Sequence, residues 1–136
     1  MTRAMALSCC LLASATPARA AEASEAAALQ AAEAWLKLID TGQYGASWDA
    51  ASSSFHKAVP RSTWEKKAAA AREPLGKVLE RKVSSQELTH ELPGAPDGTY
   101  VVLIFDTRFE HKERGHETVI MTLDDGRFRA ASYFIR

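Results

Sequence analysis

The stretch YVVLIF at residues 100–105 decides the fold of this chain, and it continues as DTRF to residue 109. Its six consecutive apolar residues are rich in β-branched and aromatic types and are too few for a periodic helix. They therefore predict a strand that is buried on at least one face. Asp97-Gly98 before the run and residues 113–115 (ERG) after it are turn signals. We expect a central β-strand with further strands beside it.

Two turns set the expected register of the strands that follow. If residues 113–115 form a three-residue loop with glycine in the left-handed conformation, Phe105 faces Leu123. Asp125-Gly126 predicts a type I′ turn, which places Leu123 opposite Phe128. In this register, the side chains that point to one face of the sheet are apolar in all three strands. We expect the helices to cover that face. Its members are Val101, Leu103, Phe105, Phe109, Val119, Met121, Leu123, Phe128, Ala130 and Phe134.

The opposite face of the predicted sheet mixes apolar and charged residues. The same register aligns Asp106, Thr122 and Arg129 in one row. One interpretation is a solvated face with a cross-strand ion pair of little energetic value. The other is an interface, because apolar area beside charged groups suits a sheet-to-sheet dimer or a ligand surface. The residues expected at that interface are Ile104, Asp106, Ile120, Arg129 and Tyr133.

Upstream of the strands, apolar residues recur at helical spacing. They predict three helices, over residues 21–39, 43–57 and 62–72. We expect Ser24 to open the first helix, Gly42 to end it, and a capping box over residues 62–65 to open the third. Each helix carries one tryptophan, which we interpret as a core anchor of the helical layer. These tryptophans are Trp35, Trp48 and Trp64.

The first predicted strand spans residues 78–92 and has two apolar parities, which a one-residue bulge near residues 84–85 would reconcile. With the helices upstream, the prediction is an α+β domain. Three N-terminal helices pack on one face of a four-stranded antiparallel sheet. Arg72 and Arg81 flank residues 74–76, and we interpret Arg72 as bonding the terminal carbonyls of the third helix.

Residues 1–20 have the pattern of a secretory signal peptide. Arg3 is followed by an apolar core at residues 4–15, then by Pro17 and the small-residue pattern at residues 18–20. Cleavage near Ala20 leaves residues 21–136 as a single domain in the periplasm or secreted. A lipoprotein signal is the alternative, but the apolar stretch before the cysteines is short for it. We expect no membrane span, since no apolar run is long enough.

Composition excludes several classes of function. The 17 basic and 17 acidic residues balance without a basic block, which argues against a nucleic-acid partner. Both cysteines lie in the predicted signal peptide, so the mature domain has no thiol chemistry. Glycine-rich phosphate loops and His-Glu-x-x-His are absent. His111 and His116 flank a turn, and we interpret them as solvated rather than as metal ligands. We expect no metal and no cofactor.

Five blocks of the chain follow one another in the order of a known family. They are Ala34–Leu36, Tyr44–Ser52, Arg72–Gly76, Leu92–Val102 and Tyr133–Ile135. They resemble a bacterial exported family catalogued as domain of unknown function 4019 (DUF4019). The resemblance implies a cone of helices and a curved sheet, similar to cystatin-like and nuclear-transport-factor-two-like (NTF2-like) domains. It implies no activity, because related cones include both enzymes and binding modules.

Two hypotheses for function follow, and the sequence does not decide whether the protein is an enzyme. The first is a non-catalytic periplasmic module that binds a small ligand or an envelope protein and forms a homodimer through the mixed sheet face. A purely structural accessory of an envelope complex is a variant of it. The second is a small-molecule enzyme with a pocket between the helices and the inner sheet face. The residues expected to line such a ligand pocket are Trp48, Arg72, Tyr100 and Thr107.

Overall fold

The computed structural model describes residues 14–136, which form one helical layer and one sheet. The helices are α1 (Pro17–Asp40), α2 (Tyr44–Asp49), α3 (Ser53–Ala58) and α4 (Arg61–Arg72), followed by the 3₁₀ turn η1 (Glu73–Leu75). The strands are β1 (Val78–Thr89), β2 (Tyr100–Phe109), β3 (Lys112–Asp124) and β4 (Arg127–Ile135). Their order is β1-β2-β3-β4, and all three pairings are antiparallel.

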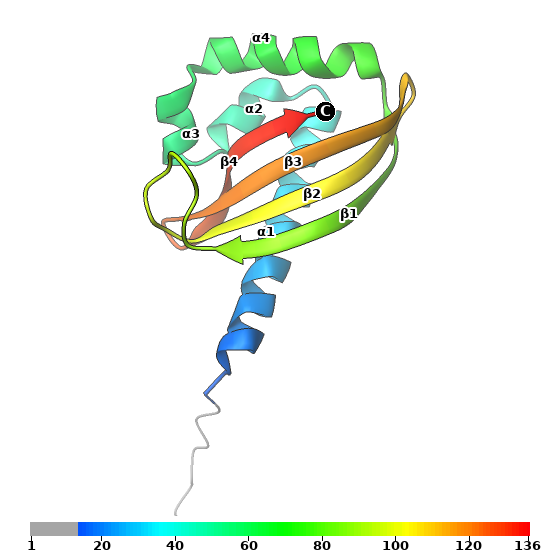
Figure 1. Ribbon diagram of the computed structural model, residues 1–136. Coiled ribbons are helices and arrows are strands. Elements are labelled where there is room, and N and C mark those ends of the chain that lie inside the picture. The colour runs from blue at the N-terminus through cyan, green and yellow to red at the C-terminus, as the bar shows by residue number, and fades with distance from the viewer. Residues whose placement is uncertain (1–13) are drawn as a thin grey trace, which may run out of the picture.

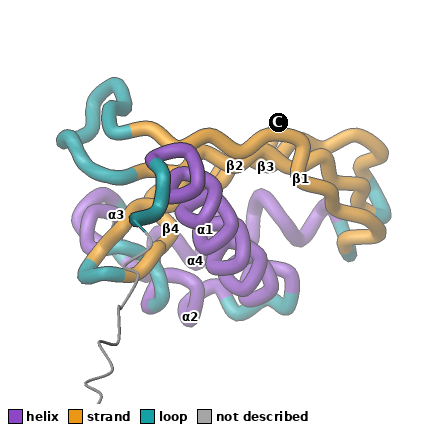
Figure 2. The backbone as a smooth tube through the Cα atoms, turned by 90° about the horizontal axis from the view of Figure 1, so that it is seen from below, coloured by secondary structure: helices purple, strands orange, loops and turns teal. Residues whose placement is uncertain are grey.

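The helices cover one face of a curved sheet, as Figures 1 and 2 show. The predicted α+β class is therefore confirmed, while the finer similarity to cystatin-like and NTF2-like cones stays a prediction. Within residues 14–136, no helix is long and apolar enough to cross a membrane. The signal-peptide prediction lies mostly outside the described residues. Of the predicted peptide, residues 17–20 lie in the first turn of α1.

The helix boundaries differ from the prediction at three places. The helix expected over residues 43–57 is divided into α2 and α3, because Ser52 caps α3 and its backbone N–H donates to the carbonyl of Ala130 at 2.9 Å. The α1 helix begins after the cap Thr16 rather than at Ser24. The α4 helix follows Pro60 without a side-chain cap, so the predicted capping box was wrong. Gly42 does end the first helix, with φ of 74°.

The inner sheet face packs on an aromatic cluster of the helices. Trp35 stacks on Trp64 at 6.0 Å, and Phe55 and Tyr133 meet these rings edge-on. Trp35 and Trp64 are thus the core anchors that were predicted. Trp48 is only partly buried: it stacks on His56 at 3.9 Å at the margin of the core. The sheet residues of this core are Val101, Leu103, Phe105, Val119, Met121 and Ala130.

The β2–β3 hairpin turns earlier than the sequence predicts. Its turn is Glu110-His111, whose N–H groups donate to the carbonyls of Lys77 and Leu75 at 2.9 Å each. Phe105 therefore faces Glu117 instead of Leu123. The register differs by an even number of residues, so the inward parity of both strands survives. Asp106 now faces His116, and the predicted row of Asp106 with Arg129 was wrong.

The β3–β4 hairpin has the predicted type I′ turn, with φ of 52° at Asp125 and 76° at Gly126. Leu123 faces Phe128 as expected. Farther along β4, Met121 pairs with Ala130 but Ile120 pairs with Ser132, so β4 has a bulge between these two partners. The residues of β4 after the bulge therefore face the side of the sheet opposite to the one predicted.

The reversed parity exchanges the positions of Tyr133 and Phe134. Tyr133, predicted at the outer interface, faces Val119 and contacts the aromatic cluster on the inner face. Phe134, predicted inside, is 41% exposed on the outer face. Leu123 was also predicted inside and is 46% exposed near the turn.

Strand β1 confirms the predicted bulge, because its pairing with β2 shifts between Val83 and Ser85. The strand ends at Thr89, short of the predicted Leu92. A second shift between Val78 and Glu80 adds to its irregularity. As an edge strand it is poorly covered, and Leu79 is 51% exposed.

Replacing Gly115 by alanine tests the packing at the start of β3. A Cβ at this position would lie 2.9 Å from Cε2 of Phe109 and 3.1 Å from the backbone oxygen of Thr107. We expect Gly115→Ala to lower the free energy of unfolding by about 1–3 kcal/mol in urea denaturation. Gly98→Ala is the matched control, because its Cβ would make an ordinary 3.4 Å contact with Tyr100. Equal stabilities of the two variants would contradict the expectation.

Candidate functional site

A cluster of charged and hydroxyl side chains lies under the sheet where α1 and α4 end. We call it the buried charge network. It takes one residue from each of the two long helices and from each of the four strands. This origin explains why no single stretch of sequence displays it. Its members are Asp40, Arg72, Arg81, Thr107, Glu117 and Tyr133.

Glu117 is the centre of the network, and its side chain is fully buried. It shares the inward parity of Val119, so the sheet itself directs the carboxylate into the core. Thr107 Oγ1 donates to Glu117 Oε1 at 2.6 Å, and the Tyr133 hydroxyl donates to Oε2. Arg81 supplies two further bonds, from Nε at 2.8 Å and from Nη2 at 3.2 Å. Both carboxylate oxygens are thus satisfied.

Arg81 connects this carboxylate to a second one. On its other edge, Nη1 and Nη2 donate to the two oxygens of Asp40 at 2.7 and 2.9 Å. One guanidinium therefore binds two carboxylates, each through two N–H groups, which is the geometry that favours arginine over lysine. This arrangement ties the edge strand β1 to the end of α1.

Arg72 completes the network from the end of α4. Its Nη2 donates to Asp40 Oδ1 at 2.7 Å, and its Nη1 lies 3.4 Å from the Tyr133 hydroxyl and 3.8 Å from Glu117 Oε2. The guanidinium lies over the ring of Phe109, 5.0 Å from its centroid. The Arg72 side chain thus bonds other side chains, so the interpretation that it caps its own helix was wrong.

The network is electrically balanced, with two arginines and two carboxylates. Burial opposes ionisation of Asp40, but hydrogen bonds from Arg81 and Arg72 outweigh it and lower the pKa of that carboxyl. Burial and the charge of Glu117 raise the pKa of Tyr133 well above its ordinary value. The phenol therefore stays protonated and serves as a donor. This arrangement suits holding the helices and strands together better than it suits transferring a proton.

The structure separates the four residues predicted to line a ligand pocket. Arg72 and Thr107 meet at Glu117. Trp48 lies on α2, where its Nε1 donates to the carbonyl of Val59 at 2.8 Å. Tyr100 lies on the outer face, with its hydroxyl donating to the carbonyl of Pro96 at 2.6 Å.

Sequence reasoning missed Asp40 and Glu117. One signal for Glu117 was available, because it occupies an inward position between apolar residues of the same parity. A buried carboxylate requires a cationic partner. The two arginines noted around residues 74–76 were the candidates for that role.

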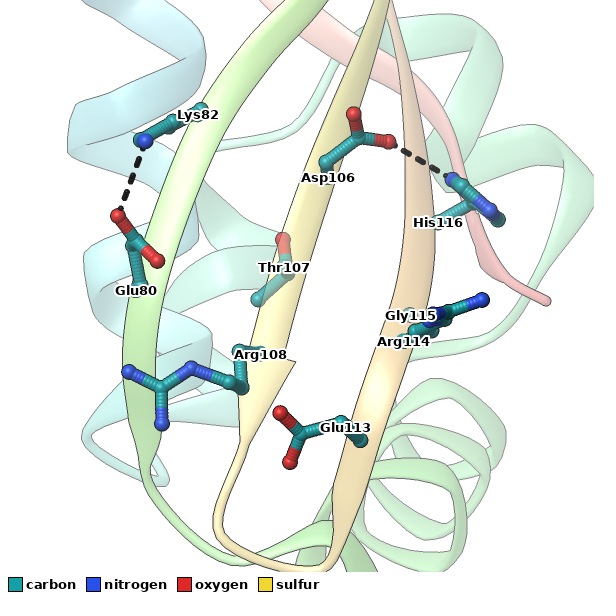
Figure 3. A pocket seen from close by; sticks show the side chains of 9 residues that line it. All are labelled: Glu80, Lys82, Asp106, Thr107, Arg108, Glu113, Arg114, Gly115 and His116. Carbon is teal, nitrogen blue, oxygen red and sulfur yellow. Dashed lines mark hydrogen bonds and ion pairs between the residues drawn. The ribbon is translucent and has the colours of Figure 1, made fainter.

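Three hollows of about 300 Å³ or more bear on the predicted sites. One, of about 330 Å³, lies at the charged end of the outer face, where Asp106 contacts His116 at 2.9 Å and Glu80 contacts Lys82 at 3.1 Å (Figure 3). A second, of about 330 Å³, lies between α1 and β4 and is mostly apolar. The third, of about 300 Å³, lies beside the buried charge network and includes Asp40 and Arg72. Of the residues predicted at an interface, Ile104, Asp106 and Ile120 lie on the outer face, and Arg129 shares that parity through its pairing with Thr122.

Neutralising Glu117 tests whether the network holds the fold together. Glu117→Gln keeps the shape of the side chain but leaves the buried Arg72 and the partly buried Arg81 with one carboxylate. We expect the free energy of unfolding to fall by about 3–5 kcal/mol in urea denaturation. Glu80→Gln, which breaks an exposed pair with Lys82, should change it by about 1 kcal/mol or less. A similar small effect of Glu117→Gln would contradict this role.

The lowered pKa of Asp40 predicts a dependence of stability on pH. A carboxyl whose pKa is lower in the folded state adds stability above its ordinary pKa of 3.8, and that stability is lost as the pH falls through the folded value. Unfolding free energies measured from about pH 5 to about pH 2 should therefore fall less steeply in Asp40→Asn than in the wild type. Asp97→Asn, in the exposed loop before β2, should keep the wild-type slope. Equal slopes in all three proteins would refute the expectation.

Comparison with known proteins identifies the family but assigns no activity. A family model with the description "Protein of unknown function (DUF4019)" matches residues 31–133. The matched region includes α2, α3, α4 and the first three strands complete, together with every residue of the buried charge network. Neither a curated protein nor a solved structure matches the chain. The chain therefore belongs to the DUF4019 family.

Proposed function

We propose that this protein is a non-catalytic binding module of the periplasm, whose outer sheet face binds a second copy of the chain. The observation that carries the proposal is the outer face, whose apolar centre between polar margins suits association. The ionisable groups of the interior neutralise one another, which does not suit catalysis.

Support for a non-catalytic role comes from the accessibility of the charged groups. A general acid or base must reach the proton that it transfers. Glu117 is fully buried, and its three hydrogen-bond donors are the protein side chains of Arg81, Thr107 and Tyr133. Asp40 is partly exposed, but both its oxygens accept bonds from arginine. Neither carboxylate therefore offers a free oxygen to a substrate.

Support for association comes from the cross-strand rows of the outer face. Val102 faces Ile120 in one row, and Ile104 shares the next row with Phe134 through Thr118. The isoleucines and Val102 are partly exposed, and Phe134 is 41% exposed. An apolar centre with a polar rim is the usual anatomy of a protein interface.

A second copy is the partner that the charges favour. The margin next to the apolar rows carries both signs: Lys82 and Arg108 are basic, and Glu80 and Asp106 are acidic (Figure 3). A face dominated by one sign would repel its own copy, whereas this mixed margin can meet itself with opposite charges. The sheet faces of two copies would then pack about 10 Å apart.

Support for a periplasmic location comes from the sequence of residues 1–20, with its basic start, apolar core and small-residue pattern. The absence of cysteine after residue 10 means that the domain needs no disulfide in that compartment. Intact-mass measurement of the exported protein would locate the cleavage point.

A small-molecule enzyme remains the second candidate, and one observation favours it. The hollow of about 300 Å³ beside the buried charge network brings Tyr44 close to Asp40 and Arg72. We rank it second because Asp40 and Arg72 bond each other at 2.7 Å. The interior between the helices and the inner sheet face, where the pocket was expected, holds the aromatic cluster.

Light scattering on the exported protein tests the dimer. We expect the wild type to have twice the chain mass and Ile104→Asp to have the mass of one chain, because the charge would be buried in the apolar centre. Leu123→Asp is the matched control: it also places a charge on an exposed apolar residue, but away from these rows, and should leave the dimer intact. A wild type that is monomeric at every concentration, or a dimeric Ile104→Asp variant, would refute the proposal.

A further inference from the structure

The groove between α1 and β4 is more apolar than the other two hollows described above. We call it the α1–β4 groove. On the helix it is bounded by Ala31, Ala34, Trp35 and Leu38, and on the sheet by Met121 and Phe128. Its volume is about 330 Å³, which is at the lower end of the range for small-molecule sites.

Small side chains produce the hollow. The core-facing stripe of α1 is complete without them, because Ala32, Leu36 and Ile39 are already buried against the sheet. Ala31 and Ala34 lie on the neighbouring flank and line the groove with methyl groups only. The indole of Trp35 is fixed at the base of the groove by its bond from Nε1 to the carbonyl of Ser47 at 2.8 Å. The groove is therefore preformed.

Charge indicates which kind of ligand fits. The two charged residues that line the groove, Arg127 and Arg129, are both basic. Within residues 14–136, neither forms an ion pair within 4 Å. The nearby carboxylate of Asp124 accepts bonds from the backbone N–H and the hydroxyl of Ser53 at 2.7 and 3.0 Å, and its charge also acts on Arg129 without forming an ion pair with it. The apolar lining and the two arginines without an ion pair within 4 Å together favour a ligand with an apolar tail and an anionic head.

We propose that the α1–β4 groove binds a free, single-chain anionic amphiphile, with its tail over Trp35 and its head beside Arg127 and Arg129. The inference deepens the proposed function by naming a ligand class, and it rests on the protein being a binding module. It does not depend on the apolar rows of the outer face, because none of their residues lines the groove. A neutral amphiphile with a tail of equal length would gain only the apolar contacts. A cationic amphiphile would meet two like charges.

Decanoate is the probe, titrated below the concentration at which it forms micelles and followed by calorimetry and tryptophan fluorescence. We expect saturable binding of one molecule per chain, with decanol weaker and decyltrimethylammonium weaker still. The double variant Arg127→Gln with Arg129→Gln should lose about tenfold in affinity for decanoate and nothing for decanol. Absence of saturable binding, or equal affinity for the three probes, would overturn the proposal.

A variant that fills the groove provides the second readout. Ala34→Leu places a larger side chain in the hollow from an exposed helical position, where leucine is well tolerated. It should abolish decanoate binding and leave the thermal unfolding midpoint unchanged. Ala70→Leu makes the same change at an exposed position of α4 outside the groove and should bind as the wild type does. Undiminished binding by Ala34→Leu would refute the site.

The test of the groove and the test of the dimer can fail independently of each other. Decanoate is also titrated into Ile104→Asp, where we expect wild-type affinity because Ile104 lies on the outer face. If the wild type is a monomer but binds decanoate, the groove stands and the dimer falls. If the wild type is a dimer but shows no saturable binding of decanoate, the dimer proposal stands and the groove proposal is refuted.

Discussion

The burial of one carboxylate organises this fold. Glu117 is directed into the core by the alternation of β3, and a charge in that position requires donors from every side. The donors come from β1, β2 and β4, and the Arg72 guanidinium at the end of α4 lies 3.8 Å away, so the strands and the last long helix must arrive at one point. Asp40 then balances the second arginine and brings in the end of α1. Apolar packing alone would allow these elements to slide, whereas directed bonds to one carboxylate fix their relative positions.

Much of the architecture was predictable from local patterns. The apolar run at residues 100–105 and the Asp125-Gly126 turn each contain their own signal, and the parity of β2 and β3 follows from alternation. The register between β2 and β3 was not predictable, because the turn at residues 110–111 is held by carbonyls of the segment before β1. The bulge in β4 was also hidden, since it exchanges two aromatic residues, Tyr133 and Phe134, that suit either face.

The candidate site was less accessible to sequence reasoning for a related reason. Its six residues are spread from position 40 to position 133, and each has an ordinary local explanation. Arg72 resembled a helix cap until its partners were known. Only the pairing of strands shows that Glu117 and Arg81 lie on one face, two strands apart. The surfaces left free by this interior, the apolar rows outside and the groove beside α1, are where a partner or a ligand has room.

Strand β1 depends on this interior more than its neighbours do. Its apolar residues Leu79 and Val83 are exposed, and besides its ladder with β2 it is anchored by Arg81 and by the N–H of Leu88, which donates to Glu25 Oε1 at 3.2 Å. Acid that protonates Asp40 would weaken that anchor while leaving the aromatic cluster intact. β1 would then detach before the rest of the domain melts and would expose the hydrogen-bonding edge of β2, a template for strand exchange between molecules. The first step of acid-induced aggregation in this protein is therefore expected at an edge of the sheet, well before its centre is disturbed.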